Sequence, residues 1–192
     1  MEKHRYTAIP TENPSRRILP ARLILTVFPT EVIGDFSSFQ KIEQYMQKGY
    51  GVVVNYSHFS SSDHLRTIGT FITEVKSIAE GKIVSPIAEH QYNTPIKKFC
   101  HETHVTLMPI ITNNTLTAYD QQGIPRPDKN SCREKYYAYI TTAQQVLDQG
   151  GSVFIAPQGG RKPTLGNALT HGPISNLLKN YPNEKLLFVC AG

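Results

Sequence analysis

The chain has 192 residues, enough for one globular domain with a sizeable core. Hydrophobic residues make up 39% and charged residues 18%, which excludes a disordered tail and a bundle of membrane helices. The net charge of +5 favours anionic partners without choosing among phosphate esters, acidic lipids and nucleic acid. The three cysteines lack C-x-x-C spacing, so we expect no disulfide framework and a reducing compartment, the cytoplasm or an organelle stroma.

The N-terminal part is expected to precede the folded domain. Residues 1 to about 20 are polar and contain three prolines, which predicts a loosely ordered arm. We therefore divide the chain into an arm or short helical segment, residues 1–37, and an α/β domain, residues 38–192. No secretory signal is expected, and prolines and charges break the apolar stretch 19–33, so it cannot span a bilayer. Because the sequence stops directly after an apolar strand, the domain either is incomplete there or closes its sheet with that strand.

Helical and strand patterns then alternate along the chain. The expected helices cover residues 38–48, 65–78, 95–103, 133–149 and 173–179. The expected strands cover residues 51–55, 83–88, 105–111, 152–156 and 185–190. Pro86 places the second strand at a sheet edge, and residues 112–131, which lack periodicity, are expected to form a functional or disordered loop. This order predicts a single-domain α/β fold with a mixed, mostly parallel sheet covered by helices.

The loop after the first strand carries a candidate general base. His58 and Asp63 lie between a buried strand and an amphipathic helix, at the carboxyl edge of the sheet where α/β proteins usually bind ligands. A carboxylate that accepts one imidazole N–H fixes the tautomer and leaves the other ring nitrogen to take a proton. The alternative is structural: Ser60 and Asp63 have the spacing of a capping box, with the acid at the third helical position.

The loop after the fourth strand carries a candidate anion site. Gly159 and Gly160 allow close backbone approach, and amides in such a turn form an anion nest. Arg161 adds a planar fork that matches phosphate oxygens, and Lys162 adds a point charge. The alternative is a tight surface turn with incidental charge. Since both loops follow buried strands, we expect them to open at the same edge of the sheet.

These two motifs, in this order and context, resemble those of the glycerolipid acyltransferase family. That family has N-H-x4-D first and P-E-G-T-R later, or A-P-S-G-G-R in its soluble plastid-type glycerol-3-phosphate members. Here His58-x4-Asp63 precedes Ala-Pro-Gln-Gly-Gly-Arg161, nearest the plastid-type version. The resemblance covers residues 45–190 and implies the family's α/β fold.

The resemblance also implies an activity and its residues. His58 would deprotonate an acceptor hydroxyl, Asp63 would orient that histidine, and Arg161 with the two glycine amides would hold the acceptor's phosphate. The donor would be a fatty acyl thioester of coenzyme A or acyl carrier protein, used as co-substrate with no bound cofactor and no metal. The acceptor would be a glycerol-phosphate or a lysophospholipid, and membrane contact would be peripheral.

Three departures from the family pattern concern the acceptor. Ser57 stands where the family usually has Asn, and Gln158 replaces the glutamate of the commoner later motif. The family's middle basic motif has no clean match. Its candidates are Arg126, Lys129 and Arg133. The departures also leave open an inactive lipid- or acyl-binding relative of the same fold.

Other function classes have weaker signals. His101 and His104 form a pair without an evident third ligand, so a solvated helix end is favoured over zinc. Dispersed basic residues and the absence of Trp argue against nucleic-acid binding. The nucleophile elbow G-x-S-x-G of serine hydrolases is absent. An acyl groove could involve the tyrosines of 136–139 or segment 19–33, although ordinary core and surface roles are favoured for both.

Overall fold

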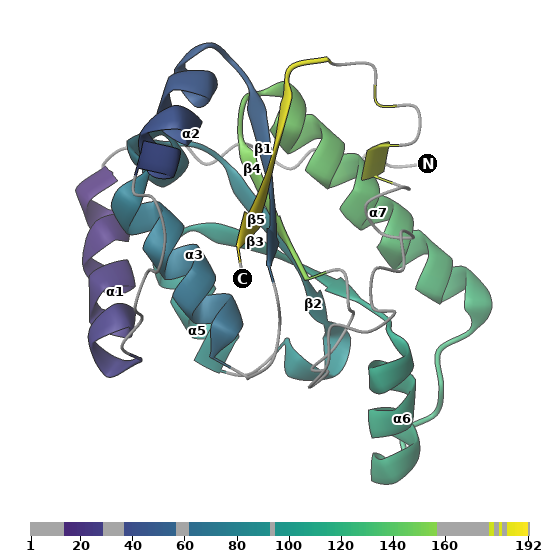
Figure 1. Cartoon of the computed structure of the whole chain (residues 1–192). Coiled ribbons are helices and arrows are strands. Elements are labelled where there is room, and N and C mark those ends of the chain that lie inside the picture. Colours follow the sequence, from purple (N-terminus) through teal and green to yellow (C-terminus); the bar gives the residue numbers. More distant parts are fainter. Residues whose placement is uncertain are drawn as a thin grey trace.

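A five-stranded sheet in which every described pairing is parallel forms the centre of the computed structural model (Figure 1). The structure describes residues 14–28, 37–56, 62–92, 95–156, 177–178, 181 and 184–191. The strands are β1 (Gly51–Tyr56), β2 (Ile83–Ala88), β3 (Val105–Ile110), β4 (Ser152–Ile155) and β5 (Leu186–Ala191). Their order is β3-β2-β4-β1-β5, so β1 and β4 are neighbours inside the sheet. The predicted single-domain α/β class is confirmed, and the sheet, which was expected to be mixed and mostly parallel, is parallel in every described pairing.

Helices cover both faces of this sheet (Figure 1). They are α1 (Pro14–Val27), α2 (Ser37–Gln47), α3 (Asp63–Glu74), α4 (Lys76–Glu80), α5 (Pro95–Glu102), α6 (Asn113–Gln122) and α7 (Lys129–Asp148), with a 3-10 turn η1 (Glu89–Gln91). Helices α1 to α5 share one apolar cluster with the sheet, and α7 packs on the opposite face. Among the described residues, no helix is long and apolar enough to cross a bilayer.

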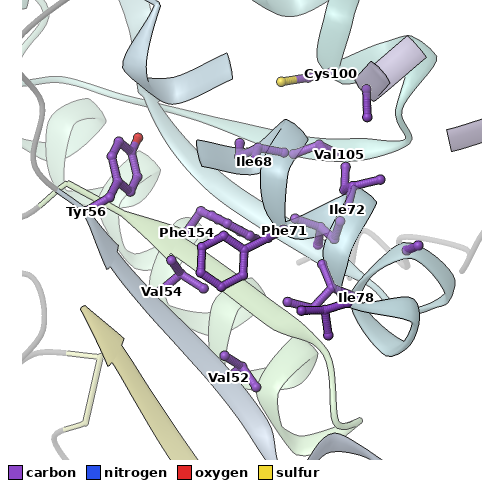
Figure 2. Packing of buried hydrophobic residues seen from close by; sticks show 14 of the residues in the cluster. Val52, Val54, Tyr56, Ile68, Phe71, Ile72, Ile78, Cys100, Val105 and Phe154 are labelled. Carbon is purple, nitrogen blue, oxygen red and sulfur yellow. The ribbon is translucent and has the colours of Figure 1, made fainter. Parts of the chain in front are cut away.

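The sheet is buried on both faces, which explains the continuous β-branched run of β1. Val52 and Val54 point into the cluster under α3, and Val53 points toward α7. Figure 2 shows Phe71 of α3 against Phe154 of β4, and their ring centroids lie 5.6 Å apart in an edge-to-face arrangement. The apolar stripe of α3 therefore holds that helix across the two central strands.

Two segments that were expected to be irregular contain helices. Residues 14–20, placed in a loose arm, are the first half of α1, because Pro14 suits the first turn and packing on α3 outweighs the cost of Pro20 inside the helix. Residues 113–122, placed in a loop, form α6. A Thr112–Thr115 capping box starts it and Gly123, with a φ of 66°, ends it. Only Thr115 of α6 is buried, so the apolar periodicity that reveals most helices is absent.

Two further expectations are corrected in detail. Strand β2 lies between β3 and β4 rather than at an edge, but its pairing with β4 stops at Val84, two residues before Pro86. The helix expected over 65–78 is broken at Val75, whose backbone is extended. Glu43 of α2 accepts hydrogen bonds from the backbone N–H and the hydroxyl of Ser77, 2.8 and 2.7 Å long, and so caps α4 from outside.

The remaining expected elements are confirmed within a few residues, with α7 beginning at Lys129 rather than at 133. Of the short helix expected over 173–179, only Leu177 and Leu178 belong to the described residues, and both are helical. The glycine-rich loop expected after the fourth strand, with Gly159 to Lys162, lies outside the described residues.

Close approach between β1 and α7 makes one glycine indispensable. A Cβ on Gly51 would lie 2.6 Å from the backbone oxygen of Leu147, whereas a Cβ on Gly69 would meet α1 at an ordinary 3.6 Å. We expect Gly51→Ala to lower the free energy of unfolding by about 2 kcal/mol or more, because backbone must move. Gly69→Ala, within a helix, should raise it by up to about 1 kcal/mol. Urea unfolding of both variants checks this, and equal stabilities would contradict the packing described.

Candidate functional site

The carboxyl ends of β1 and β4 lie side by side. Their parallel register pairs Asn55 with Ile155, and the strands end at Tyr56 and Ile155 (Figure 1). The two sequence motifs begin directly after these ends. The candidate residues His58, Gly159, Gly160, Arg161 and Lys162 themselves lie outside the described residues. The sheet thus brings together the two chain positions from which the motif segments start, as the alternation of strands and helices predicted.

Asp63 is the first residue of α3. The preceding Ser62 is the N-cap and makes no side-chain capping bond. Asp63 is therefore not at the third helical position that a capping box with Ser60 requires, but it lies in the first turn, where an acidic residue can also serve the helix start. A carboxylate in the first turn is stabilised by the positive end of the helix dipole, which favours its charged form. Asp63 therefore lies at the start of α3, at the carboxyl edge of the sheet beside β1.

A buried polar pair joins the end of β1 to the first turn of α3. The Tyr56 hydroxyl and Nδ1 of His64 are 2.5 Å apart, and both side chains are buried. Burial raises the pKa of Tyr56 well above its usual range, with smaller contributions from Cys100, Tyr139 and Asp63. The phenol therefore stays protonated at neutral pH and can donate to an imidazole nitrogen. This contact fixes the strand end relative to the helix start that carries Asp63.

The sequence analysis did not single out this pair. His64 lies four residues before Ile68, in line with the buried stripe of α3, and is itself buried. A histidine on the apolar stripe of a helix needs a polar partner inside the protein. That requirement, together with a tyrosine at the end of the preceding buried strand, was a signal from which the pair could have been inferred.

A second polar cluster lies at the carboxyl end of β2. Glu89 of η1 forms an ion pair with Lys135 of α7, and Nδ1 of His90 lies 3.2 Å from the hydroxyl of Thr115 in α6. These contacts tie η1 to α6 and α7 on the same edge of the sheet as Asp63. None of the four residues was a sequence candidate. These two contacts hold η1, α6 and α7 together beside the carboxyl end of β2 and so fix the position of the connection from β3 to α7.

The basic candidates of this connection are on the surface. Arg126 pairs with Asp120 through its Nε and one terminal nitrogen, and this contact lowers the pKa of Asp120. Both side chains are exposed. Arg133 and Lys129 are exposed on the first half of α7. A phosphate bound by Arg126 would have to compete with the Asp120 carboxylate for the guanidinium. Arg133 and Lys129 are therefore the better candidates for binding a phosphate.

The histidine pair considered for metal lies elsewhere. His101 is exposed at the end of α5, and His104 has a φ of 53° in the turn before β3, at the amino edge of the sheet. Within the described part of the chain, no group of three or more His, Cys, Asp or Glu side chains could hold a metal ion. The HETH segment is therefore separated by the length of β3 from the edge that carries Asp63.

Comparisons with known proteins add no family to this description. No family model matches the chain, and the search of curated proteins finds no match.

Removal of the Tyr56 hydroxyl tests the contact that positions the start of α3. We expect Tyr56→Phe to lower the free energy of unfolding by about 1–3 kcal/mol, because a buried imidazole nitrogen loses its hydrogen bond while packing is unchanged. Tyr45→Phe, at an exposed position of α2, is the control and should have no measurable effect. Chemical denaturation measures both, and a Tyr56→Phe variant as stable as the unsubstituted chain would refute the assigned contact.

Proposed function

We propose that the chain is an O-acyltransferase of the glycerolipid type. It transfers a fatty acyl group from an acyl thioester, on coenzyme A or acyl carrier protein, to a hydroxyl of a glycerol-phosphate or lysophospholipid. The resemblance supports this acceptor class, as does the presence in the sequence of both a candidate general base and a candidate anion-binding motif.

One observation carries the proposal. The register of β1 with β4 sets Asn55 beside Ile155, so the segments with His58 and with Arg161 leave the sheet from adjacent strand ends. Two motifs that are distant in the sequence can then act on one substrate, as a hydroxyl and a phosphate of the same small molecule require. The position of Asp63 at the first residue of α3 supports it, because the carboxylate is fixed at that same edge.

The proposed mechanism needs only residues of these two segments and of the start of α3. The neutral imidazole of His58 takes the proton of the acceptor hydroxyl while the Asp63 carboxylate holds the other ring N–H. The oxygen attacks the thioester carbonyl, a tetrahedral oxyanion forms, and its collapse breaks the C–S bond. The thiolate leaves and takes the proton from the imidazolium, giving an ester and a free thiol. Arg161 and the Gly159–Gly160 amides hold the phosphate in this scheme.

A non-catalytic lipid- or acyl-binding protein of the same fold is the second candidate. Ser57 favours it, because the family usually places Asn directly before the histidine. The presence of both His58 and Asp63 favours the enzyme, since a binding protein needs neither a base nor its orienting carboxylate.

Thiol release tests the proposal. The purified chain is given palmitoyl-coenzyme A or palmitoyl-acyl carrier protein with glycerol-3-phosphate or lysophosphatidic acid. We expect release that requires an acceptor, and a decrease of kcat by about 10²–10⁴-fold in His58→Ala and in the isosteric Asp63→Asn, because each removes part of the general base. Arg161→Ala should mainly raise KM for the phosphate-bearing acceptor.

His101→Ala is the matched control, because it removes an exposed imidazole at the opposite edge of the sheet and should leave the rate unchanged. The contradicting result is a protein that is folded by circular dichroism and binds palmitoyl-coenzyme A but releases no thiol with any donor and acceptor. That result would favour the non-catalytic binding protein over the enzyme.

A further inference from the structure

The outer face of α1 carries a row of apolar side chains. Leu19, Leu23 and Val27 follow one another at intervals of four residues and are 74%, 64% and 61% exposed. At that spacing they lie on one side of the helix and span about 12 Å along its axis. They include the two most exposed leucines among the described residues, so the row is a distinct surface feature rather than a scatter of single apolar groups.

Among the described residues, α1 is held to the core by its other face and not by this row. Ala21 is fully buried, Ile18, Ile24 and Phe28 pack against the same core cluster, and Arg17 is buried with its guanidinium on the backbone oxygens of Ala79 and Gly81. Figure 1 shows α1 on the outside of the helical layer, beside α3. A helix with apolar residues on two sides normally buries both. The outer row is therefore suited to a partner outside the chain.

The charges beside the row indicate what that partner is. Arg16 and Arg22 are exposed on α1, and the helix contains no acidic residue. An apolar stripe edged by arginines is typical of helices that lie in the boundary between lipid headgroups and acyl chains, where the guanidinium groups meet phosphates. A second copy of α1 would instead bring arginines against arginines without a carboxylate on the same helix to neutralise them.

The direction of α1 relates this surface to the candidate site. Arg17, near the start of α1, reaches the end of α4, whereas Ala21 and Leu25 flank Gly69 in the middle of α3. The helix therefore runs antiparallel to α3, and its last turn points toward the edge at which Asp63 begins α3.

We propose that the Leu19–Leu23–Val27 row of α1 docks the protein on an anionic phospholipid surface, with Arg16 and Arg22 at the headgroups. The proposal does not depend on acyl transfer, because it rests on the exposure and charge of α1 alone.

Sedimentation of the whole chain with vesicles tests it, in the absence of any acyl donor or acceptor. The vesicles are phosphatidylcholine alone or phosphatidylcholine mixed with phosphatidylglycerol. We expect binding to the mixed vesicles that weakens with added salt and is much weaker on phosphatidylcholine alone. The triple variant Leu19→Ser, Leu23→Ser, Val27→Ser should bind about 100-fold or more weakly, because three apolar side chains no longer enter the bilayer.

Two further variants separate the contributions. Arg16→Gln with Arg22→Gln should lose the preference for anionic vesicles and keep the weaker binding. Tyr137→Ser removes an exposed apolar side chain from α7, on the other side of the sheet, and should bind like the unsubstituted chain. Since all substituted side chains are exposed, each variant should keep its circular dichroism spectrum and unfolding midpoint.

Three results would overturn the proposal. The unsubstituted chain does not bind the mixed vesicles, the triple variant binds them as well as the unsubstituted chain, or the chain is a dimer without lipid that the triple variant converts to a monomer. The last result would assign the row to a second copy. If the chain releases thiol but does not bind vesicles, the membrane proposal fails and the proposed acyl transfer is unaffected. If it binds vesicles through the row but releases no thiol, the proposed acyl transfer fails and the membrane proposal is unaffected.

Discussion

Parallel pairing between β1 and β4 is the constraint on which the rest of the structure depends. Parallel strands need crossovers, so the helices between β1 and β4 must lie on the faces of the sheet and all strands must end at one edge. The register of Asn55 with Ile155 then makes two segments, far apart in the sequence, start from one place. Shared burial of Val52, Val54 and Phe154 in one cluster stabilises this register, because a one-residue shift would turn them to the other face.

Contacts between the sheet and the helices fix the position of β1 and of the helix start at its carboxyl end. The strand β1 approaches α7 so closely at Gly51 that only hydrogen fits there, and Tyr56 at its other end bonds His64 in the first turn of α3. These two contacts hold both ends of β1 and so position Asp63 at the start of α3. On the outside of the layer, α1 packs with its inner face, and Leu19, Leu23 and Val27 on its outer face are exposed. The edge that carries the proposed acyltransferase site and the exposed row of α1 are separate surfaces, and α3 contributes to the first and packs against the helix of the second.

The sequence predicted those parts of the fold that have a periodic apolar signal and missed those that lack one. Helix α7 and strands β1 and β4 bury regular patterns and were found, whereas α6 is held by a capping box and a terminal glycine and has one buried residue. The break at Val75 depends on Glu43 from another helix, which no local pattern contains. At the site, the motifs indicated which segments matter, but the Tyr56–His64 contact joins two elements and required the tertiary structure.

Hydrogen–deuterium exchange in the presence of glycerol-3-phosphate reports where a phosphate-bearing acceptor binds. We expect backbone amides of residues 57–63 and of 157–162 to become protected together, while peptides from α7 and from the turn at His104 exchange unchanged. Protection that falls on only one of the two segments, or on a different edge of the sheet, would contradict the claim that the ends of β1 and β4 build a single site.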